Sequence, residues 1–458
     1  MRIAAIGLCD PGYSEKVAAE QQAASVERLK LSITDVVDAG LQPDERRSLQ
    51  AITALAKQHA EKPFDALFLV QAAWARPAVL LQIIRAFPVL PMVLYSPGSP
   101  IVNGLIRSIA PAAGACASLP ILRRHEIKFK YAFSAPGAPI AEEDFMPFLR
   151  AAAASRKMLG AKLLMIGFGD MRLQATGFDV QEVHETFGVE VESRDMLELQ
   201  KEMDSLDRKD VAQQIEQLTA NWVFEGRNTR PEALQKVVAM FLVLDRWAQE
   251  CGYVGLSIKC PTGVAAHLGI TPCLVGCLLA GKYHYVCEND IPGLLGQVIL
   301  GFLSDQMSAY WEFYEVLSDA ILFGCCGFAP ESFLREGVRV RVFEGFMTGL
   351  ACCSRIKNGP YTVVRLGKLA SHTCPAPRGS AGAADGLYRL ACAEGVAADP
   401  PTWCEDCLGE GQHPSVLFKP DGLSVAEFMR GALAQHVAVV PGSWAEALDE
   451  FKIIKGIG

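Results

Sequence analysis

The sequence lacks any long uninterrupted apolar run. Half of its 458 residues are hydrophobic, yet charges, Gly or Pro interrupt the apolar runs within about 12 residues, short of the ~18 that a membrane span needs. The start, MRIAAIGLCDPG, has one Arg and a short β-like run but no long apolar core or cleavage site of a signal peptide. These absences predict a cytoplasmic protein with no membrane partner.

Positive charge is also scarce. Lys and Arg number 43 against 51 Asp and Glu, so the formal net charge is −8 at pH 7. No Lys/Arg stripe stands out, which argues against a nucleic-acid partner. The 15 cysteines are an odd number scattered over the chain, which favours reduced thiols in a cytosolic protein over a disulfide framework.

Several catalytic motifs are missing. The chain contains neither G-x-x-x-x-G-K-[ST] nor G-x-S-x-G, which disfavours a P-loop NTPase and a serine hydrolase with a nucleophile elbow. MIGFGD (165–170) contains G-x-G but lacks the third Gly of a dinucleotide-binding fingerprint. The hypothesis of a nicotinamide oxidoreductase would depend on this turn alone. A strand-to-helix turn in an ordinary α/β sheet is the favoured interpretation.

Length and periodicity predict several domains. A chain of this length is expected to hold two or three. Short apolar strands alternate with amphipathic helices from residue 2 onward, and the pattern starts again at KLLMIGFGD (162–170), which indicates parallel sheets with crossover helices. We therefore predict α/β domains over 1–157 and 158–305. Predicted strands of the first include RIAAIGL (2–8), ITDVVD (33–38), ALFLVQ (66–71) and PMVLYS (91–96).

Beyond about residue 305 the pattern changes. RVRVFEGF, TGLACC, YTVVRLGKL and SVLFKP are short β-like runs between turn residues, with no long helix among them, which predicts an antiparallel sheet or barrel. A helix over SVAEFMRGALAQ (424–435), with Ser424 as N-cap, and the strand VAVVPG (437–442) follow. We predict a β-rich domain over 306–458.

The segment VCENDIPGLLGQ (286–297) places polar side chains where a buried strand turns into a helix, although burying such groups unpaired costs several kcal/mol. Glu288 is predicted to lie at the carboxyl edge of the sheet. Glu312, with Glu315 as an alternative, follows in YWEFYEV, and His436 lies at a helix-to-strand junction. Two carboxylates and an imidazole suit a divalent cation such as Mn or Mg, or proton transfer beside a polarised carbonyl. Surface acids and structural histidines are common enough that spacing alone does not establish such a site.

Other polar residues have simpler interpretations. Asp290 is expected to cap the helix that begins near Pro292, and Asn289 to hold the turn. Lys259, at the end of a strand, suits an anionic or hydroxylated substrate as well as it suits solvent. The neighbouring Cys260 would need a nearby His to act as a nucleophile. The segment 372–413 contains a C-x2-C (WCEDCLG), half of a zinc site, but reduced thiols are favoured there.

CENDIPG followed by an apolar helix resembles the glutamate-bearing segment of the L-fucose isomerase-like family, which includes L-fucose/D-arabinose isomerase and, more distantly, L-arabinose isomerase. GLSIKC before TPCLVGCLLA, GFGDMRLQATGFDVQEVHETFGVEVE and QHVAVVPGSWAEALDEFKIIKGI are similar to family segments in the same order. The resemblance spans roughly 160–458. It implies two Rossmann-like α/β domains and a carboxy-terminal β-rich, barrel-like domain.

The resemblance also implies a chemistry. A Mn²⁺-type ion (or Mg²⁺ or Co²⁺) would be held by Glu288, Glu312 and His436, and both glutamates would serve catalysis in aldose–ketose isomerisation of an open-chain sugar through a cis-enediol. Family members form homo-oligomers, which predicts a hexamer or trimer. The chain departs from the family pattern in Cys325, which precedes Cys326-Gly327 where relatives often carry a His, and in the Cys-rich segment 372–413. A modified sugar, sulfonated or deoxy, fits these departures. Candidates to meet an anion are Arg172, Lys259 and Arg378.

A second function class is compatible with the same residues. An intracellular sugar-binding or regulatory protein could keep the isomerase fold without turnover. Metal content discriminates between the two hypotheses, because the binding protein needs no stoichiometric divalent ion at Glu288.

Overall fold

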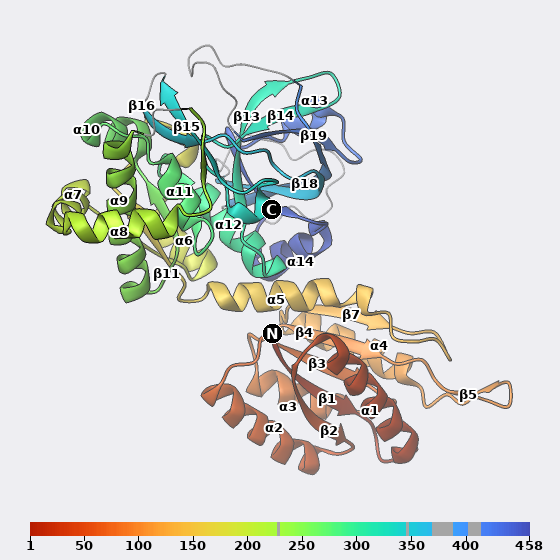
Figure 1. The fold of residues 1–458 in the computed structure, drawn as a ribbon. Helices are drawn as coiled ribbons and strands as arrows, with labels where there is room; N and C mark the ends of the chain where they lie inside the picture. Colours follow the sequence, from red (N-terminus) through yellow and green to blue (C-terminus); the bar gives the residue numbers. More distant parts are fainter. Residues whose placement is uncertain (227–229, 345–347, 369–387, 402–413) are drawn as a thin grey trace. The chain divides into compact units, whose positions relative to one another are not determined.

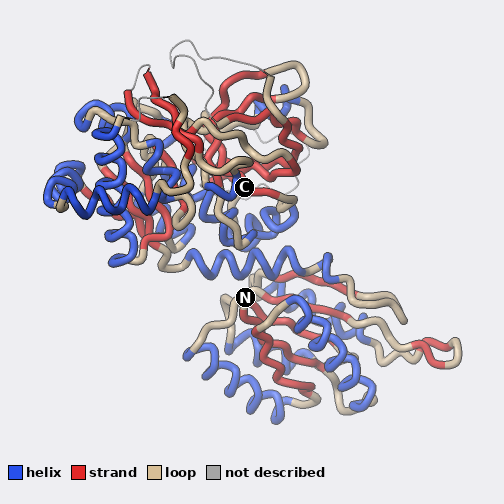
Figure 2. Tube along the Cα trace, in the orientation of Figure 1, coloured by secondary structure: helices blue, strands red, loops and turns tan. Residues whose placement is uncertain are grey.

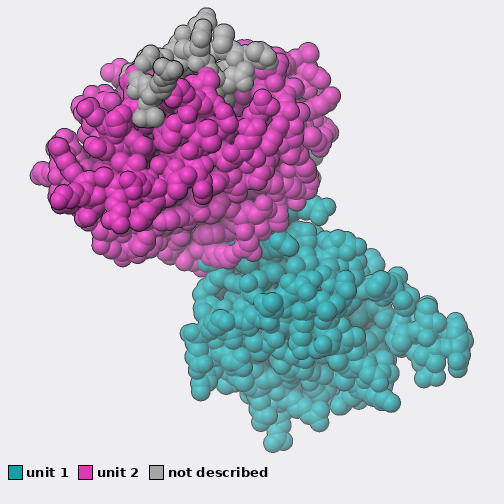
Figure 3. All heavy atoms as spheres, viewed as in Figure 1, with its two compact units in different colours: residues 1–156, 446–454 teal, residues 157–445, 455–458 magenta. Residues whose placement is uncertain are grey.

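The computed structural model describes residues 1–226, 230–344, 348–368, 388–401 and 414–458. They form two compact units (Figure 3). The first unit is Met1–Arg156 with Glu446–Ile454, and the second is Lys157–Ala445 with Lys455–Gly458. The predicted boundaries between three domains, after residues 157 and 305, stay a prediction.

The first unit contains a five-stranded parallel sheet with strand order β2-β1-β3-β4-β7 (Figures 1 and 2). Two predicted strands, 2–8 and 66–71, match β1 and β3 residue for residue, whereas β2 starts two residues later than predicted because Ile33 still caps α1. The strands are β1 Arg2–Leu8, β2 Asp35–Gln42, β3 Ala66–Gln71, β4 Met92–Ser96 and β7 Phe129–Phe133, with a small hairpin of β5 Ile101–Val102 and β6 Leu105–Ile106. The helices are α1 Glu15–Ser32, α2 Glu45–Glu61, α3 Pro77–Ala86, α4 Pro111–Arg124 and α5 Met146–Met158.

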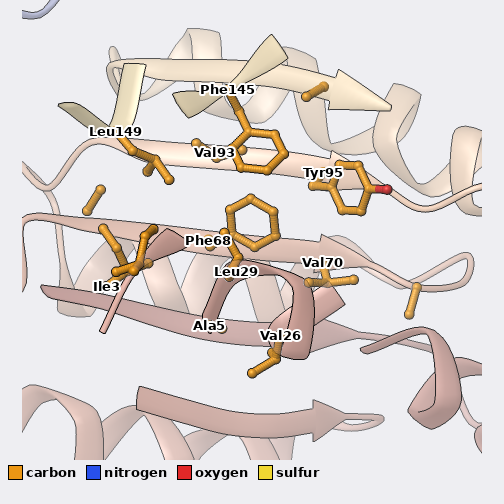
Figure 4. Packing of buried hydrophobic residues seen from close by; sticks show 14 of the residues in the cluster. Ile3, Ala5, Val26, Leu29, Phe68, Val70, Val93, Tyr95, Phe145 and Leu149 are labelled. Carbon is orange, nitrogen blue, oxygen red and sulfur yellow. The ribbon is translucent and has the colours of Figure 1, made fainter. Parts of the chain in front are cut away.

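The central strands of this sheet are apolar on both faces because helices cover both. One core cluster joins the sheet to α1 and α5, and a second joins it to α2, α3 and α4. In the first cluster the Phe68 ring packs against those of Tyr95 and Phe145, with centroids 5.6 and 5.1 Å away (Figure 4). Continuous apolar strands therefore predicted a parallel sheet correctly.

The second unit begins with a four-stranded parallel sheet of order β12-β11-β8-β9. Its strands are β8 Lys162–Ile166, β9 Glu190–Arg194, β11 Tyr253–Ile258 and β12 His284–Cys287. The helices are α6 Val180–Phe187, α7 Met196–Ser205, α8 Arg208–Leu218, α9 Pro231–Cys251, α10 Ala266–Leu268, α11 Cys273–Leu279 and α12 Ile291–Ser304. Among the described residues no single helix is long and apolar enough to cross a membrane; one pair bent by 110°, Cys260–Leu268 with Cys273–Leu279, meets the length and composition criteria only when both parts are combined.

The carboxy-terminal strands close into an antiparallel barrel of order β13-β14-β19-β18-β17-β20. The barrel strands are β13 Ala309–Val316, β14 Ile321–Gly324, β17 Gly359–Lys368, β18 Tyr388–Ala398, β19 Ser415–Pro420 and β20 His436–Pro441, with helices α13 Val425–Arg430 and α14 Ala445–Lys455. A separate three-stranded sheet contains β10 Val223–Phe224, β15 Arg339–Glu344 and β16 Thr348–Cys352. The predicted fold class is confirmed as parallel α/β sheets followed by an antiparallel barrel, while the predicted runs RVRVFEGF and TGLACC lie outside that barrel.

Helix α12 joins the sheet to the barrel within the second unit. It packs on β11 and β12 on one side and on β13, β17 and β20 on the other, and nearly every residue of it is buried, as expected of a helix that is apolar all round. At its start, a Cβ on Gly293 would lie 2.6 Å from Asp290 and 2.7 Å from Arg365. Glycine thus allows these two side chains to meet over the helix N-terminus.

Candidate active site

The candidate site is centred on the turn between β12 and α12. Glu288 and Asn289 both have left-handed backbone, with φ of 62° and 51°, which costs about 1 kcal/mol or more per non-glycine residue and is concentrated at functional sites. Asn289 Nδ2 donates to the carbonyl of Ile166, the last residue of β8, at 2.9 Å. Asp290 caps α12 as predicted, because it accepts from the Gly293 N–H at 3.0 Å.

Glu312 and His436 reach the same place from the barrel. They stand opposite each other on the antiparallel strands β13 and β20, so their side chains share one face. The imidazole is fully buried, and its Nε2 lies 3.7 Å from Glu288 Oε2 and 3.8 Å from Glu312 Oε1. The structure thus brings together the three predicted ligands. Glu315, the alternative acid, is exposed near the end of β13.

A buried ion pair holds the other side of the imidazole. Asp290 receives two hydrogen bonds from the guanidinium of Arg365, one of them 2.8 Å long, and one from the Tyr310 hydroxyl. Asp290 Oδ2 lies 3.5 Å from His436 Nδ1, but the alignment falls short of a hydrogen bond, since neither ring nitrogen has a partner among the described residues. The Tyr310 ring packs on the imidazole with centroids 4.5 Å apart. A carboxylate behind a histidine is the arrangement that orients a metal-binding imidazole.

Burial and neighbouring charges shift the pKa values of Glu288 and Asp290 in opposite directions. Burial raises the pKa of Glu288 to about 7; the His436 imidazole opposes this rise, and the charge of Glu312 adds to it. Burial also acts to raise the pKa of Asp290, but Arg365 outweighs it and holds that pKa well below its usual range. Asp290 therefore stays a fixed anion, whereas Glu288 gains and loses its proton near neutral pH.

Two thiols border the same space. Cys326 donates to Glu312 Oε2 at 2.9 Å. The Cys326 sulfur belongs to two groups of possible metal ligands. It forms one group with Cys287 and Glu288 and another with Glu312 and His436, and within each group all ligand atoms lie within 4.8 Å of one another. Cys260, considered above as a nucleophile, is buried, and burial raises the pKa of its thiol well above the ordinary value. A thiol kept protonated in this way is a poor nucleophile.

The donors present fit a divalent cation. Two atoms that each bind one ion at ~2.1 Å lie no more than ~4.2 Å apart, and both distances from His436 Nε2 to the glutamates are shorter than that. The two carboxylates themselves are farther apart, since Glu312 forms a set within 4.8 Å with Cys326 and His436, and Glu288 a different set with Cys287 and Cys326. A shared ion would therefore draw the two glutamates together. The unpartnered ring nitrogens of the buried His436 also need a partner, since an unsatisfied buried polar atom is costly. Two carboxylates and an imidazole suit Mn²⁺ or a similar ion.

The predicted anion-binding residues occupy different positions. Lys259 follows β11, and its hydrocarbon chain packs between Gly167 and Gly263. A Cβ atom placed on Gly167 would lie 3.2 Å from the Lys259 side chain, and one placed on Gly263 would lie 2.7 Å from it. Its ammonium group has no partner among the described residues. Arg172 is exposed in the loop after β8, with a left-handed φ of 59°. Arg378 lies outside the described residues.

Two buried acceptors near the site have no hydrogen-bond donor among the described residues. Asp170 is 1% exposed; its Oδ1 accepts from the main chain and hydroxyl of Thr262, while its Oδ2 has no partner. Asn289 Oδ1 is likewise unpartnered. The charge of Asp170 contributes to the raised pKa of Glu288, which places the two carboxylates in one electrostatic environment. Such acceptors suit the hydroxyl groups of a bound polyol.

The cysteine-rich segment 372–413 lies largely outside the described residues, including both cysteines of WCEDCLG. Within it, Cys392 is on β18. A zinc site in this segment stays a prediction.

No family model matches the chain. The chain is 22% identical over 350 residues to a sulfoquinovose isomerase of Alkalicoccus urumqiensis, with 75% of each protein covered. It is 24% identical over 401 residues to a sulfoquinovose isomerase of Clostridium sp. (strain MSTE9), with 83% of each covered. Two similarities at low identity, each over most of the chain, support a sugar isomerase.

Two solved structures of sugar-binding proteins show only weak similarity to this chain. The periplasmic arabinose-binding protein of a Shewanella sp. ANA-3 transporter is 11% identical, covers 66% of this chain and 86% of its own, and has a TM-score of 0.17. A solute-binding protein of Actinobacillus succinogenes with bound D-allose is 12% identical, covers 67% and 93%, and has a TM-score of 0.15. TM-scores this low establish no common fold.

Three residues of the site escaped the sequence analysis. Arg365 and Tyr310 lie in β-like runs with no motif to mark them, and Cys326 is one of two adjacent cysteines. One signal was available for Arg365, because it is a charge in the middle of the apolar run of YTVVRL (361–366), and a charge inside a buried strand implies a partner.

Proposed function

We propose that this protein is a divalent-metal-dependent aldose–ketose isomerase of the L-fucose isomerase-like family, acting on an open-chain sugar through a cis-enediol. The proposal depends on one observation. The carboxylates of Glu288, from a turn after a sheet strand, and Glu312, from a barrel strand, each lie within 3.8 Å of Nε2 of His436 on another barrel strand. The similarity to two sulfoquinovose isomerases supports the same reaction class.

The proposed substrate is a sulfonated sugar. Both relatives are named for sulfoquinovose, and a sulfonate needs a cation. Lys259, at the carboxyl edge of the sheet with a free ammonium group, suits that role. Asp170 Oδ2 and Asn289 Oδ1 are proposed to accept hydrogen bonds from sugar hydroxyls.

Glu288, Glu312 and His436 would hold the cation, which when bound polarises a carbonyl and stabilises negative charge on its oxygen. Asp290, fixed by Arg365, keeps the His436 ring in place. Without the ion, the Cys326 thiol donates to the Glu312 carboxylate.

The proton is moved by a carboxylate of the chain. It leaves the hydroxyl-bearing carbon beside the aldehyde for the carboxylate while the carbonyl oxygen gains a proton, which gives the cis-enediol. Delivery of a proton to the former aldehyde carbon, with loss of the proton on the second oxygen, gives the ketose. Glu288 and Glu312 are the two carboxylates beside the proposed ion, and either is placed to accept and return this proton.

The test is conversion of sulfoquinovose with Mn²⁺ in D₂O, followed by proton NMR. Wild-type protein and the Glu315→Gln variant, a matched change of an exposed acid, should form the ketose and incorporate a deuteron at the former aldehyde carbon. Glu288→Gln and chelator-treated protein should not. Undiminished turnover in Glu288→Gln would contradict the proposal, and sugar binding without conversion by the metal-loaded wild type would favour a binding or regulatory protein.

Self-association into a hexamer or trimer belongs to the same proposal. Native mass spectrometry of the full chain measures it directly.

A further inference from the structure

Cys326 is held in an unusual backbone turn. The Phe328 N–H donates to the Cys325 carbonyl at 2.8 Å, and both central residues of the turn, Cys326 and Gly327, have positive φ, 32° and 79°. Glycine, asparagine and aspartate are the residues that normally fill such positions. A cysteine there is under strain, and strain of this kind is retained where the side chain has a use.

The turn directs the sulfur at the candidate ligands. Cys326 Sγ lies 2.9 Å from Glu312 Oε2 and within 4.8 Å of ligand atoms of Glu288 and His436. The imidazole beside it is 0% exposed and has two unpartnered nitrogens. Cys287, the second thiol, is grouped only with Glu288 and Cys326, which makes Cys326 the better placed of the two.

We propose that Cys326 is a fourth protein ligand of the cation, so that the site offers one nitrogen, two carboxylates and one sulfur. The proposal rests on the proposed function and deepens it. On binding the ion, the Cys326 thiol would lose its proton to water and would hold the ion as a thiolate. Glu312 then loses the hydrogen bond from this thiol and is free to bind the same ion.

A sulfur ligand predicts which ions bind best. Thiolate is a soft donor, favoured by Zn²⁺ and Co²⁺ and poorly matched to Mg²⁺. The site should therefore prefer Co²⁺ or Zn²⁺ over Mg²⁺ by more than carboxylate and imidazole ligands alone would give.

The experiment is a titration of metal-free full-length protein with Co²⁺, followed by absorption spectroscopy. A thiolate ligand gives a sulfur-to-cobalt charge-transfer band in the near ultraviolet, which carboxylate and imidazole ligands do not give. We expect this band, saturating at one Co²⁺ per chain, in wild type, in Cys287→Ser and in the exposed-thiol control Cys116→Ser. Cys326→Ser should lack it and bind Co²⁺ at least about tenfold more weakly, the loss typical of even an outer-shell partner.

Each other outcome has a defined meaning. Stoichiometric Co²⁺ binding by the wild type with no charge-transfer band would overturn the Cys326 assignment and leave the proposed isomerase intact. A band lost in Cys287→Ser and kept in Cys326→Ser would also overturn it, in favour of the other thiol. Failure of wild type to bind Co²⁺ would overturn both this assignment and the metal dependence of the proposed function. The absence of the band from the wild-type spectrum decides against Cys326 without any variant. If Cys326→Ser folds poorly, Cys287→Ser and Cys404→Ser decide, because a band kept in both variants excludes the second thiol and the C-x2-C of WCEDCLG as its source.

Discussion

Replacing Glu288 with Gln should stabilise the protein while removing the centre of its candidate site. The carboxyl is 8% exposed, and its pKa rises from 4.5 in the unfolded chain to about 7 in the fold. Because the pKa is higher in the folded state than in the unfolded chain, this carboxyl contributes most to the free energy of unfolding below pH 4.5, and the contribution is lost as the pH rises through about 7. The difference corresponds to about 3 kcal/mol above pH 7.

Gln resembles the protonated carboxyl at every pH. The Glu288→Gln variant should therefore match wild type at about pH 4 and exceed its free energy of unfolding by about 3 kcal/mol at about pH 8. Urea unfolding in EDTA measures this, with fluorescence of Trp247 and Trp311, both buried in the second unit, as the signal. Glu315→Gln, the same change at an exposed site, should show no such difference. A Glu288→Gln protein no more stable than wild type at the higher pH would refute the reasoning.

Three further predictions concern the same site. Mn²⁺ affinity should fall as the pH drops below about 7, because Glu288 must lose its proton to bind a cation; calorimetry at several pH values measures this, and a constant affinity would contradict it. Arg365→Met should lower the free energy of unfolding by ~3–5 kcal/mol, because it leaves Asp290 buried and unpaired. The double variant with Asp290→Asn should lose less than the sum of the single losses, and simple additivity in urea unfolding would show that the two side chains do not act as a pair. Asp170→Asn, which keeps the shape but replaces an acceptor with a donor, should raise the KM for the sugar by about tenfold or more with a smaller effect on kcat; an unchanged KM would remove Asp170 from the proposed substrate site.

The sequence predicted those parts of the fold that depend on local pattern. Continuous apolar runs located β1, β3, β8 and β12, and the polar turn after β12 marked Glu288 as a residue at the edge of a sheet. Asp290 was identified as a helix cap because capping needs only residues three positions apart. The helix predicted over 424–435 is shorter, Val425–Arg430, because Gly431 is its C-cap.

Pairing between distant segments could not be predicted in the same way. The runs that became β15 and β16 have the same alternation as barrel strands, but β15 pairs with the two-residue strand β10, more than a hundred positions earlier. The Asp290–Arg365 pair spans 75 positions, and nothing local in either segment names the other. The convergence of Glu312 and His436 on Glu288 was anticipated only through a family resemblance, for the same reason.

The first unit is assembled from two stretches of the chain, and this has a consequence for biosynthesis. Ile454 packs against a core cluster of this unit and Glu450 is paired with Lys130 of β7, so residues 446–454 complete a domain whose sheet is made much earlier in translation. When residues 1–156 have been synthesised, this α/β unit is therefore still incomplete. Its last helix is synthesised only after nearly three hundred further residues. During that interval, chaperones are expected to bind the surface of this layer that Ile454 later covers.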